Sequence, residues 1–423
     1  MKVLMLAPGT RGDVAPAAGL AASFVADGHE VTIVAGDEYA PLVLEAGCAH
    51  VGFDAPISLP RVEEMPPDGA PHQEASTSGR GSGVRAYLEV LRTYMDAAAS
   101  AALAAAPGAE VILTNAISPY GHDIAEHLGV PSASALLQPA EPSTAYPPMI
   151  ASWRDLGPAN RWAGRLAERV RAPYDPACAR VRVELGMPAE TRVHAQRRRR
   201  SAGLRVHHGI SSAVLPRPSD WPERLTLDGF WWPPPAGGPT AAGATLSEVL
   251  ASGPPPVVVT LGSLPPGGDV ADAVAEAVRR TGLRTLLQGD ALADIAQQLA
   301  GELGPHHVLH AGDVPHDWLL PRAAAVVHQA GAGVTAAALR AGVPSVTLPM
   351  HTDQPFWARR LAALSAGTDP IPMKRVTADA LVARITEAAT SQTLRDGASR
   401  VREAIVHEDS TAPLRAWLRR LGS

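Results

Sequence analysis

Short apolar runs alternate with helical segments from the first residues of the chain, and this alternation constrains the fold more than any other feature. Residues 2–7 form an apolar run, residues 16–27 have a helical pattern that ends at Gly28, and residues 31–35 form a second apolar run. A strand, a helix and a strand in this order predict a βαβ unit, which implies a parallel sheet with right-handed crossovers. Further strands are predicted at residues 111–114 and 133–137.

The alternation begins again after a proline-rich segment at residues 216–235, which we interpret as a linker between domains. The second series of strands is predicted at residues 257–261, 284–287, 308–310, 325–328 and 345–348. The sequence therefore predicts an α/β protein with two tandem Rossmann-like domains, residues 1–215 and 236–400, and a helical segment at 401–423. Such domains bind ligands at the carboxyl ends of their strands, so we expect the site in the cleft between them.

Charge and cysteine content exclude several classes of protein. The 423 residues have a net charge of -5, whereas nucleic-acid-binding proteins typically carry an excess of positive charge. The one basic run, residues 197–200, is interpreted as a solvated helix face or loop. Two distant cysteines, Cys48 and Cys178, make neither a disulfide framework nor a metal cluster, so we expect a reducing cytoplasm. No apolar stretch reaches the roughly 18 residues of a membrane span. Heavy use of Ala, Arg, Gly and Pro suggests a bacterial gene.

The loop after the first predicted strand carries a candidate catalytic acid. It reads Gly9-Thr10-Arg11-Gly12-Asp13, and its glycines permit a tight turn and leave room for a ligand. A carboxylate at this edge of the sheet can take a proton from an attacking hydroxyl group. Asp13 can equally serve as a cap for the helix that follows.

A second glycine-bearing loop follows the strand predicted at residues 325–328. His328 ends the strand, and Gly331, Ala332 and Gly333 lead into an Ala- and Leu-rich helix. Free amide groups and the positive end of the helix dipole suit a diphosphate, and His328 could add a hydrogen bond. The alternative is an ordinary helix start beside a buried structural histidine.

Smaller candidates lie at the ends of other strands. Asp353 and Gln354 form an acidic–amide pair that can bind sugar hydroxyl groups, or a turn before a helix. Ser263 could bind phosphate or cap a turn, and backbone groups near Val314 could meet a nucleobase. His122 could line the site of the molecule whose hydroxyl group attacks, which we call the acceptor, although a lone histidine of this kind is most often structural.

The loop at 331–336 also fits the glycine fingerprint of nicotinamide-dependent oxidoreductases, and Asp353 lies 20 residues beyond Gly333. That fingerprint belongs after the first strand of a dinucleotide-binding domain, whereas about three predicted strands of this domain precede the loop. An oxidoreductase is therefore the weaker interpretation.

Together these segments resemble the bacterial family 1 glycosyltransferases, close to the branch that acts on sterols and antibiotic aglycones. The resemblance rests on GTRGDVAP (9–16), LDGFWWPPP (227–235), VTLGSL (259–264), DVPHDWLLPRAAAVVHQAGAGVTAAALRAGVP (313–344) and DQPFWARR (353–360). Their order matches the family, and they span nearly the whole chain. The resemblance implies a GT-B architecture, inversion at the anomeric carbon, and a C-terminal segment that crosses back to the first domain.

The family's roles are carried over residue by residue. The resemblance makes Asp13 the general base. Gly12 and His122 remain candidates for the acceptor side. For the donor, a UDP- or TDP-sugar, it implies a set of residues that comprises Ser263, Val314, His328, Gly331, Ala332, Gly333, Asp353 and Gln354. No Asp-x-Asp metal motif is present, so no metal or other cofactor is expected. The partners expected are a nucleotide sugar and a small lipophilic acceptor, with neither nucleic acid nor a membrane span.

Two residues depart from the family's phosphate loop, which usually reads His-x-Gly-x-x-Gly-Thr. Ala330 stands where the first glycine is expected, and Val334 stands where the threonine is expected. Thr335 is adjacent, but one residue along a helix turns a side chain by about 100°. These departures leave open a second interpretation, a non-catalytic relative that binds a sugar nucleotide or assists a partner transferase.

Overall fold

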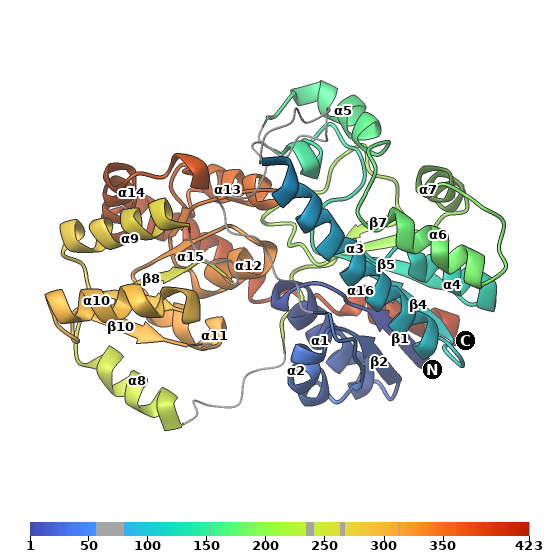
Figure 1. Ribbon diagram of the computed structural model, residues 1–423, viewed down its shortest axis with the longest axis horizontal. Coiled ribbons are helices and arrows are strands. Elements are labelled where there is room, and N and C mark those ends of the chain that lie inside the picture. The colour runs from blue at the N-terminus through green and yellow to red at the C-terminus, as the bar shows by residue number, and fades with distance from the viewer. Residues whose placement is uncertain (56–79, 153, 234–240, 263–266, 313, 423) are drawn as a thin grey trace.

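Two parallel β-sheets, each flanked by helices, lie side by side in the computed structural model (Figure 1). The structure describes residues 1–55, 80–152, 154–233, 241–262, 267–312 and 314–422. Both domains therefore have the predicted α/β class.

The first sheet has seven strands in the order β3-β2-β1-β4-β5-β6-β7. They are β1 (Lys2–Leu6), β2 (Glu30–Val34), β3 (Ala49–Val51), β4 (Val111–Thr114), β5 (Ser132–Leu136), β6 (Arg205–His208) and β7 (Leu225–Leu227). The helices of this domain are α1 (Arg11–Ala26), α2 (Ala40–Glu45), α3 (Arg80–Ala105), α4 (Tyr120–Leu128), α5 (Asn160–Ala167), α6 (Asp175–Glu184) and α7 (Arg192–Ser201). β1 pairs with β2 and β4, so the loop after β1 lies near the middle of the sheet edge.

The second sheet has five strands in the order β10-β9-β8-β11-β12. They are β8 (Val257–Thr260), β9 (Thr285–Gln288), β10 (Val308–Ala311), β11 (Ala325–His328) and β12 (Ser345–Thr347). The helices of this domain are α8 (Ala241–Ala251), α9 (Gly268–Thr281), α10 (Ala293–Leu303), α11 (His316–Leu319), α12 (Ala332–Ala341), α13 (Gln354–Ala363), α14 (Ala378–Thr390) and α15 (Gln392–Ile405), and the chain ends with α16 (Ala412–Leu421). Three strands of this sheet, β8, β9 and β10, precede β11 in the sequence. The glycine-bearing loop after β11 therefore does not follow the first strand of its domain, where a dinucleotide fingerprint would lie.

The proline-rich segment at 216–235 is more than a linker, and this part of the domain prediction was wrong. It contributes β7, which pairs with β6 at the edge of the first sheet, so the first domain extends beyond residue 215. A three-residue strand between prolines gives almost no periodic signal, and an edge strand tolerates prolines beside it. α1 also begins at Arg11 and not at residue 16, with Pro16 inside the helix.

The last helix lies on the first domain. Leu414, Trp417 and Leu418 of α16 join the core that contains Val3 and Phe24, and Figure 1 places α16 beside β1 with both termini close together. Arg415 forms an ion pair with Asp27 at the end of α1. The C-terminal segment therefore crosses from the second domain back to the first.

The two domains share a buried apolar cluster. Phe356 and Trp357 of α13 pack with Tyr146, Val206 and other residues of the first domain. The rings of Phe356 and Tyr146 lie 6.1 Å apart in a T-shaped arrangement. This apolar contact brings the carboxyl ends of the two sheets toward a common region between the domains.

Candidate active site

Asp13 lies in the first turn of α1, directly after the loop that follows β1. Its Oδ2 atom accepts a hydrogen bond of 2.9 Å from the backbone N–H of Thr10 and one of 3.2 Å from the Thr10 hydroxyl group. Gly9 has a φ of 138°, and a Cβ atom there would lie 2.3 Å from Oδ2 of Asp13. Glycine at position 9 is therefore required both by the backbone and by the space that Asp13 occupies.

The capping and the proton-accepting interpretations of Asp13 are compatible. Burial raises the pKa of Asp13 to about 6; the Thr10 N–H opposes this shift and the nearby charge of Asp353 adds to it. A carboxyl group with such a pKa is ionised at neutral pH and is a stronger base than an ordinary aspartate.

An apolar pocket opens beside Asp13 in the first domain. Its volume is about 40 Å³, and it is lined mainly by apolar side chains of β1, α1 and β4, with Trp231 at one wall. Asn115 and Gln138 add polar groups to the lining. The pocket can receive part of an apolar molecule beside the Asp13 carboxylate, but it must widen for anything larger than a few atoms.

Tyr94 of α3 holds the loop that carries Asp13, and sequence reasoning missed it. The Tyr94 hydroxyl accepts a 2.7 Å hydrogen bond from the N–H of Gly9 and donates a 3.0 Å bond to the Gly9 carbonyl oxygen. Burial raises the pKa of Tyr94, so the hydroxyl stays protonated. This contact joins residues 85 positions apart, and no local pattern in the sequence indicates it.

His328 ends β11 and is fully buried. Its Nδ1 atom accepts a 3.0 Å hydrogen bond from the N–H of Ala330, so the proton of the neutral ring is on Nε2. Burial, and then the charge of His316, lower the pKa of His328 to about 3. Among the described residues, Nε2 has no hydrogen-bond partner. The ring therefore presents one unused N–H donor.

The loop after His328 turns sharply into α12. Ala330 has a φ of 62°, in the left-handed region that favours glycine, and Gly331 occupies the N-cap position. A Cβ atom on Gly333 would lie 3.6 Å from the Cα atom of Gly12 in the other domain. The first turns of α1 and α12 thus meet, and the amino end of α12 faces the loop that carries Asp13.

Asp353 and Gln354 lie at the start of α13. The indole N–H of Trp357 donates to Oδ2 of Asp353 at 2.9 Å, and burial raises the pKa of Asp353. Oε1 of Gln354 accepts a 2.8 Å bond from the N–H of Met350, which leaves the Gln354 amide protons as donors. Both side chains are therefore oriented before any ligand arrives.

Val314 and Ser263 are the remaining donor-side candidates. The Val314 carbonyl oxygen accepts a 2.6 Å hydrogen bond from the side-chain amide of Gln288, at the end of β9. Sequence reasoning missed Gln288, whose buried Oε1 has no partner within the ranges that the structure describes. Ser263 lies outside the described residues.

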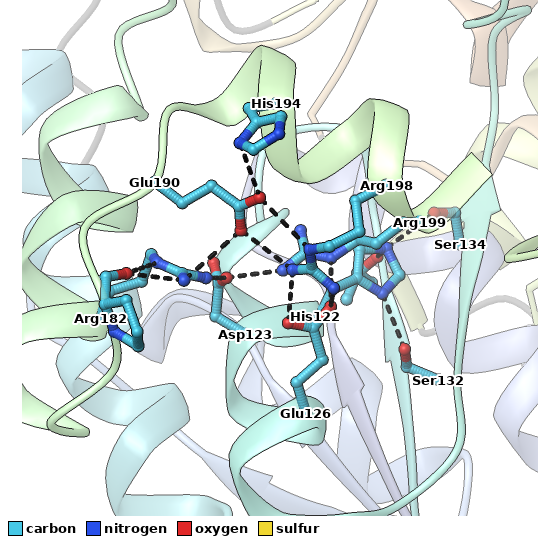
Figure 2. A network of polar contacts seen from close by, with 12 residues as sticks. His122, Asp123, Glu126, Ser132, Ser134, Arg182, Glu190, His194, Arg198 and Arg199 are labelled. Carbon is cyan, nitrogen blue, oxygen red and sulfur yellow. Dashed lines mark hydrogen bonds and ion pairs between the residues drawn. The ribbon is translucent and has the colours of Figure 1, made fainter. Parts of the chain in front are cut away.

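Both ring nitrogens of His122 have hydrogen-bond partners within the first domain, and Figure 2 shows the ring with its neighbours. Its Nε2 atom lies 3.0 Å from the hydroxyl groups of Thr114 and Ser134, and its Nδ1 atom lies 2.9 Å from that of Ser132. Burial lowers the pKa of His122 to about 3. The ring has no nitrogen left for an acceptor molecule, so this geometry matches the structural alternative.

The interpretation of the arginine run at 197–200 as a solvated helix face or loop fits Arg197 and Arg198, which are exposed on α7, but is wrong for Arg199. Figure 2 shows Arg198 and Arg199 within a network of acidic side chains. Arg199 is buried and lies 2.6 Å from Asp123 and 2.7 Å from Glu126, because a buried guanidinium group requires such partners. The run therefore joins α7 to α4 inside the first domain.

Comparisons with known proteins agree with this arrangement. Residues 285–414 match the family model for the erythromycin biosynthesis protein CIII-like C-terminal domain. O-mycaminosyltylonolide 6-deoxyallosyltransferase of Streptomyces fradiae is 30% identical over 428 residues, which cover 96% of this chain and 94% of that protein. Sterol 3-beta-glucosyltransferase of Candida albicans is 27% identical, and the match covers 96% of this chain but only 27% of that longer protein.

Solved structures share the fold at lower identity. The glycotransferase of kitacinnamycin is 20% identical with a TM-score of 0.68, covering 99% of this chain and 98% of that one. Glycosyltransferase VinC in complex with DTDP is 19% identical with a TM-score of 0.65, covering 100% and 99%. Together with the near-complete match to the Streptomyces enzyme, these findings show that the chain belongs to the family 1 glycosyltransferases, GT-B enzymes that use nucleotide-sugar donors.

Proposed function

We propose that this chain transfers a sugar from UDP or TDP to a hydroxyl group of a small lipophilic acceptor, with inversion and without a metal ion. The observation that carries the proposal is the position of Asp13. Its carboxyl group, with a pKa of about 6, lies beside an apolar pocket and opposite the amino end of α12. In this arrangement the Asp13 carboxylate would lie on the acceptor side of the anomeric carbon, and the amino end of α12 would lie on the side of the leaving diphosphate.

Asp13 is the general base of the proposed reaction. The acceptor hydroxyl oxygen attacks the anomeric carbon, its proton passes to the Asp13 carboxylate, and the bond from that carbon to the diphosphate oxygen breaks. A single displacement of this kind inverts the anomeric configuration. General-base catalysis contributes about a hundredfold to ten-thousandfold to such rates.

The amino end of α12 and His328 replace a metal ion in this proposal. Charge develops on the diphosphate as it leaves, and the free amides of Gly331, Ala332 and Gly333 are aligned with the helix dipole. His328 is neutral and carries its proton on Nε2, so that it can donate without competing for the proton of the acceptor. Fixed donors aimed at developing charge supply a large part of enzymatic rate enhancement.

The donor sugar is assigned to Asp353 and Gln354. The amide protons of Gln354 are its remaining donors, so it would bind a sugar oxygen, whereas Asp353 would accept from sugar hydroxyl groups. Backbone groups near Val314 would meet the base, and Ser263 would support the phosphate. The solved structure of VinC, which is bound to DTDP, supports TDP as the nucleotide of the donor. UDP is kept as the alternative because the family resemblance implies either nucleotide.

The acceptor class is proposed from the pocket and from the relatives. Apolar side chains line most of the pocket beside Asp13. The Streptomyces relative is named for transfer to O-mycaminosyltylonolide, and the fungal relative is named for transfer to a sterol. A natural product or a sterol would place apolar rings in the widened pocket and a hydroxyl group near Asp13.

Two free, buried cysteines, Cys48 and Cys178, support a reducing cytoplasm as the compartment, which we include in the proposal. No helix in the described ranges is both long and apolar enough to cross a membrane.

Calorimetric titration with UDP and TDP in the presence of EDTA tests the donor side, and transfer to a panel of polyketide and sterol acceptors tests the reaction. We expect micromolar nucleotide binding, metal-independent turnover and a product of opposite anomeric configuration by NMR. Turnover that requires a divalent cation, or retention of configuration, would contradict the mechanism.

A further inference from the structure

One surface of the first domain is both apolar and basic, and the proposed reaction does not use it. It is formed by described residues between 149 and 171, around α5, which Figure 1 shows at the periphery of the molecule. Four of the nine exposed large apolar side chains of the described residues lie in this segment: Ile150, Leu156, Trp162 and Leu166. We use the name α5 face for the surface that these four side chains form together with Arg154, Arg165, Arg169 and Arg171.

α5 directs its apolar side chains away from the protein. Gly164 is buried against Pro142, where a Cβ atom would come within 2.9 Å of the proline ring. Trp162 and Leu166 lie two residues on either side of Gly164, about 200° around the helix, so they point straight into solvent. Trp162 is 69% exposed, which is unusual for a tryptophan in a monomeric soluble domain.

The same segment carries unpaired positive charge. Residues 149–171 contain five arginines and two acids, a local charge of +3 in a chain whose net charge is -5. Arg154, Arg165, Arg169 and Arg171 are exposed, and the structure, over the residues that it describes, gives them no acidic partner. The run at 197–200 differs, because Arg198, Arg199 and Arg200 all have carboxylate partners.

We propose that the α5 face docks onto an anionic lipid surface. A short amphipathic helix with Trp and Leu on its outer face and arginines beside them lies in the plane of a membrane interface, where the apolar groups enter the headgroup region and the arginines meet lipid phosphates. A second copy of this chain fits poorly, because a two-fold contact would bring the same unpaired arginines together.

The segment that carries the α5 face also contacts the second domain. Ser152, within the same segment, donates a 2.7 Å hydrogen bond to the carbonyl oxygen of Thr352, directly before Asp353. A lipid surface held by the α5 face would therefore lie near the region where the two domains meet. The docking itself does not depend on the proposed acceptor or on turnover.

Flotation of the intact protein with vesicles tests the proposal. Vesicles of phosphatidylcholine with one third phosphatidylglycerol are compared with vesicles of phosphatidylcholine alone. We expect binding to the anionic vesicles only, weakened by salt, with a blue shift of tryptophan fluorescence that Trp162→Phe abolishes.

Matched variants distinguish binding through the α5 face from non-specific binding of the protein to vesicles. Trp162→Ser with Leu166→Ser, and Arg165→Gln with Arg169→Gln, should each weaken vesicle binding about tenfold or more. Leu44→Ser with Val183→Ser removes two other exposed apolar side chains, and Arg197→Gln with Arg400→Gln removes two other exposed charges; neither pair should change binding. Nucleotide titration confirms that all variants remain folded.

Three outcomes would overturn the proposal. Failure to bind anionic vesicles would remove it directly, as would equal binding by the α5-face variants and their controls. A dimer in solution that Trp162→Ser with Leu166→Ser converts to a monomer would assign the face to a second copy instead.

Discussion

The hydroxyl group of Ser152 donates a 2.7 Å hydrogen bond to the carbonyl oxygen of Thr352, 200 residues further along the chain and in the other domain. Thr352 has a φ of 53°, a backbone conformation that is costly for a β-branched residue. It directly precedes Asp353 and Gln354, the pair assigned to the donor sugar. The first domain therefore helps to hold the loop before Asp353 in a strained conformation.

Ser152→Ala should raise the KM for the nucleotide sugar about threefold to tenfold, in line with the net worth of one hydrogen bond, and should change UDP binding little. The loop before Asp353 would lose its partner, whereas the diphosphate elements would remain. Steady-state kinetics and calorimetry check the two halves of this expectation. Ser143→Ala is the control, because Ser143 is also buried but bonds to Asp220 within its own domain. Equal effects of the two substitutions on the KM would contradict the positioning role.

The pH dependence of turnover should reflect the ionisation of the Asp13 carboxyl group. Since burial raises its pKa to about 6, kcat/KM should rise as the pH increases through that value. The stability effect has the opposite sign: the folded state holds this proton more tightly than the unfolded chain, so Asp13 contributes stability below about pH 4 that is lost as the pH rises to about 6. Thermal unfolding across this range, compared between wild type and Asp13→Asn, checks the second effect.

Substitution of Asp13 separates its base role from its capping role. Asn retains a side-chain oxygen that can accept from the Thr10 N–H, but it cannot take a proton. Asp13→Asn should therefore lower kcat about a hundredfold or more with little loss of stability. Asp13→Ala should lower kcat similarly and also destabilise the protein by about 1 kcal/mol, the typical worth of a helix cap. Unchanged turnover in Asp13→Asn would remove Asp13 from the base role.

The sequence alone predicted the elements whose signals are local. β1, β4, β8 and β11 are continuous apolar runs, and the candidate residues Asp13, His328 and Asp353 follow strands at positions where α/β proteins bind ligands. β6 escaped notice because its sequence, Arg-Val-His-His, carries no apolar run, although it is mostly buried in the sheet.

The missed site residues depend on contacts between distant parts of the chain. Tyr94 bonds to Gly9 across 85 residues, and Ser152 bonds to Thr352 across 200. Neither pair follows a helical or strand period, so only the tertiary fold brings them together. The charge network of Arg199 was missed for the same reason, because its partners Asp123 and Glu126 lie on another helix.

Substitutions of His328 can test each ring nitrogen separately. His328→Asn can keep an acceptor for the Ala330 N–H but loses the Nε2 donor, whereas His328→Gln can keep an N–H near the Nε2 position. Loss of a hydrogen bond to a charged diphosphate costs about 1.5–3 kcal/mol, so UDP affinity should fall about tenfold or more in the Asn variant and less in the Gln variant. Affinity loss only in proportion to lost stability would favour a purely structural histidine.

Ala330 shows how the backbone explains one departure from the family's phosphate loop. Its φ of 62° lies in the left-handed region, where alanine is tolerated at a cost and a β-branched residue is strongly disfavoured. Ala330→Gly should therefore leave the free energy of unfolding within about 1 kcal/mol of wild type, since relief of strain offsets the lost methyl contact. Ala330→Val should destabilise the protein by about 2 kcal/mol or more. Chemical denaturation measures both, and a well-tolerated valine would contradict the strained geometry.

The second departure, Val334, concerns the ligand and not the backbone. Thr335 is buried, and its hydroxyl group has no hydrogen-bond partner among the described residues. Since one residue along a helix turns a side chain by about 100°, we expect that it does not replace the hydroxyl that the family places one position earlier. Val334→Thr should strengthen UDP or TDP binding up to about tenfold by adding a donor in the first turn of α12, near the diphosphate. Thr335→Val is the matched control: it removes an unpaired buried hydroxyl and should raise stability without changing nucleotide affinity. If Thr335→Val weakened nucleotide binding instead, the hydroxyl of Thr335 would face the donor, and the register assigned to this loop would be wrong.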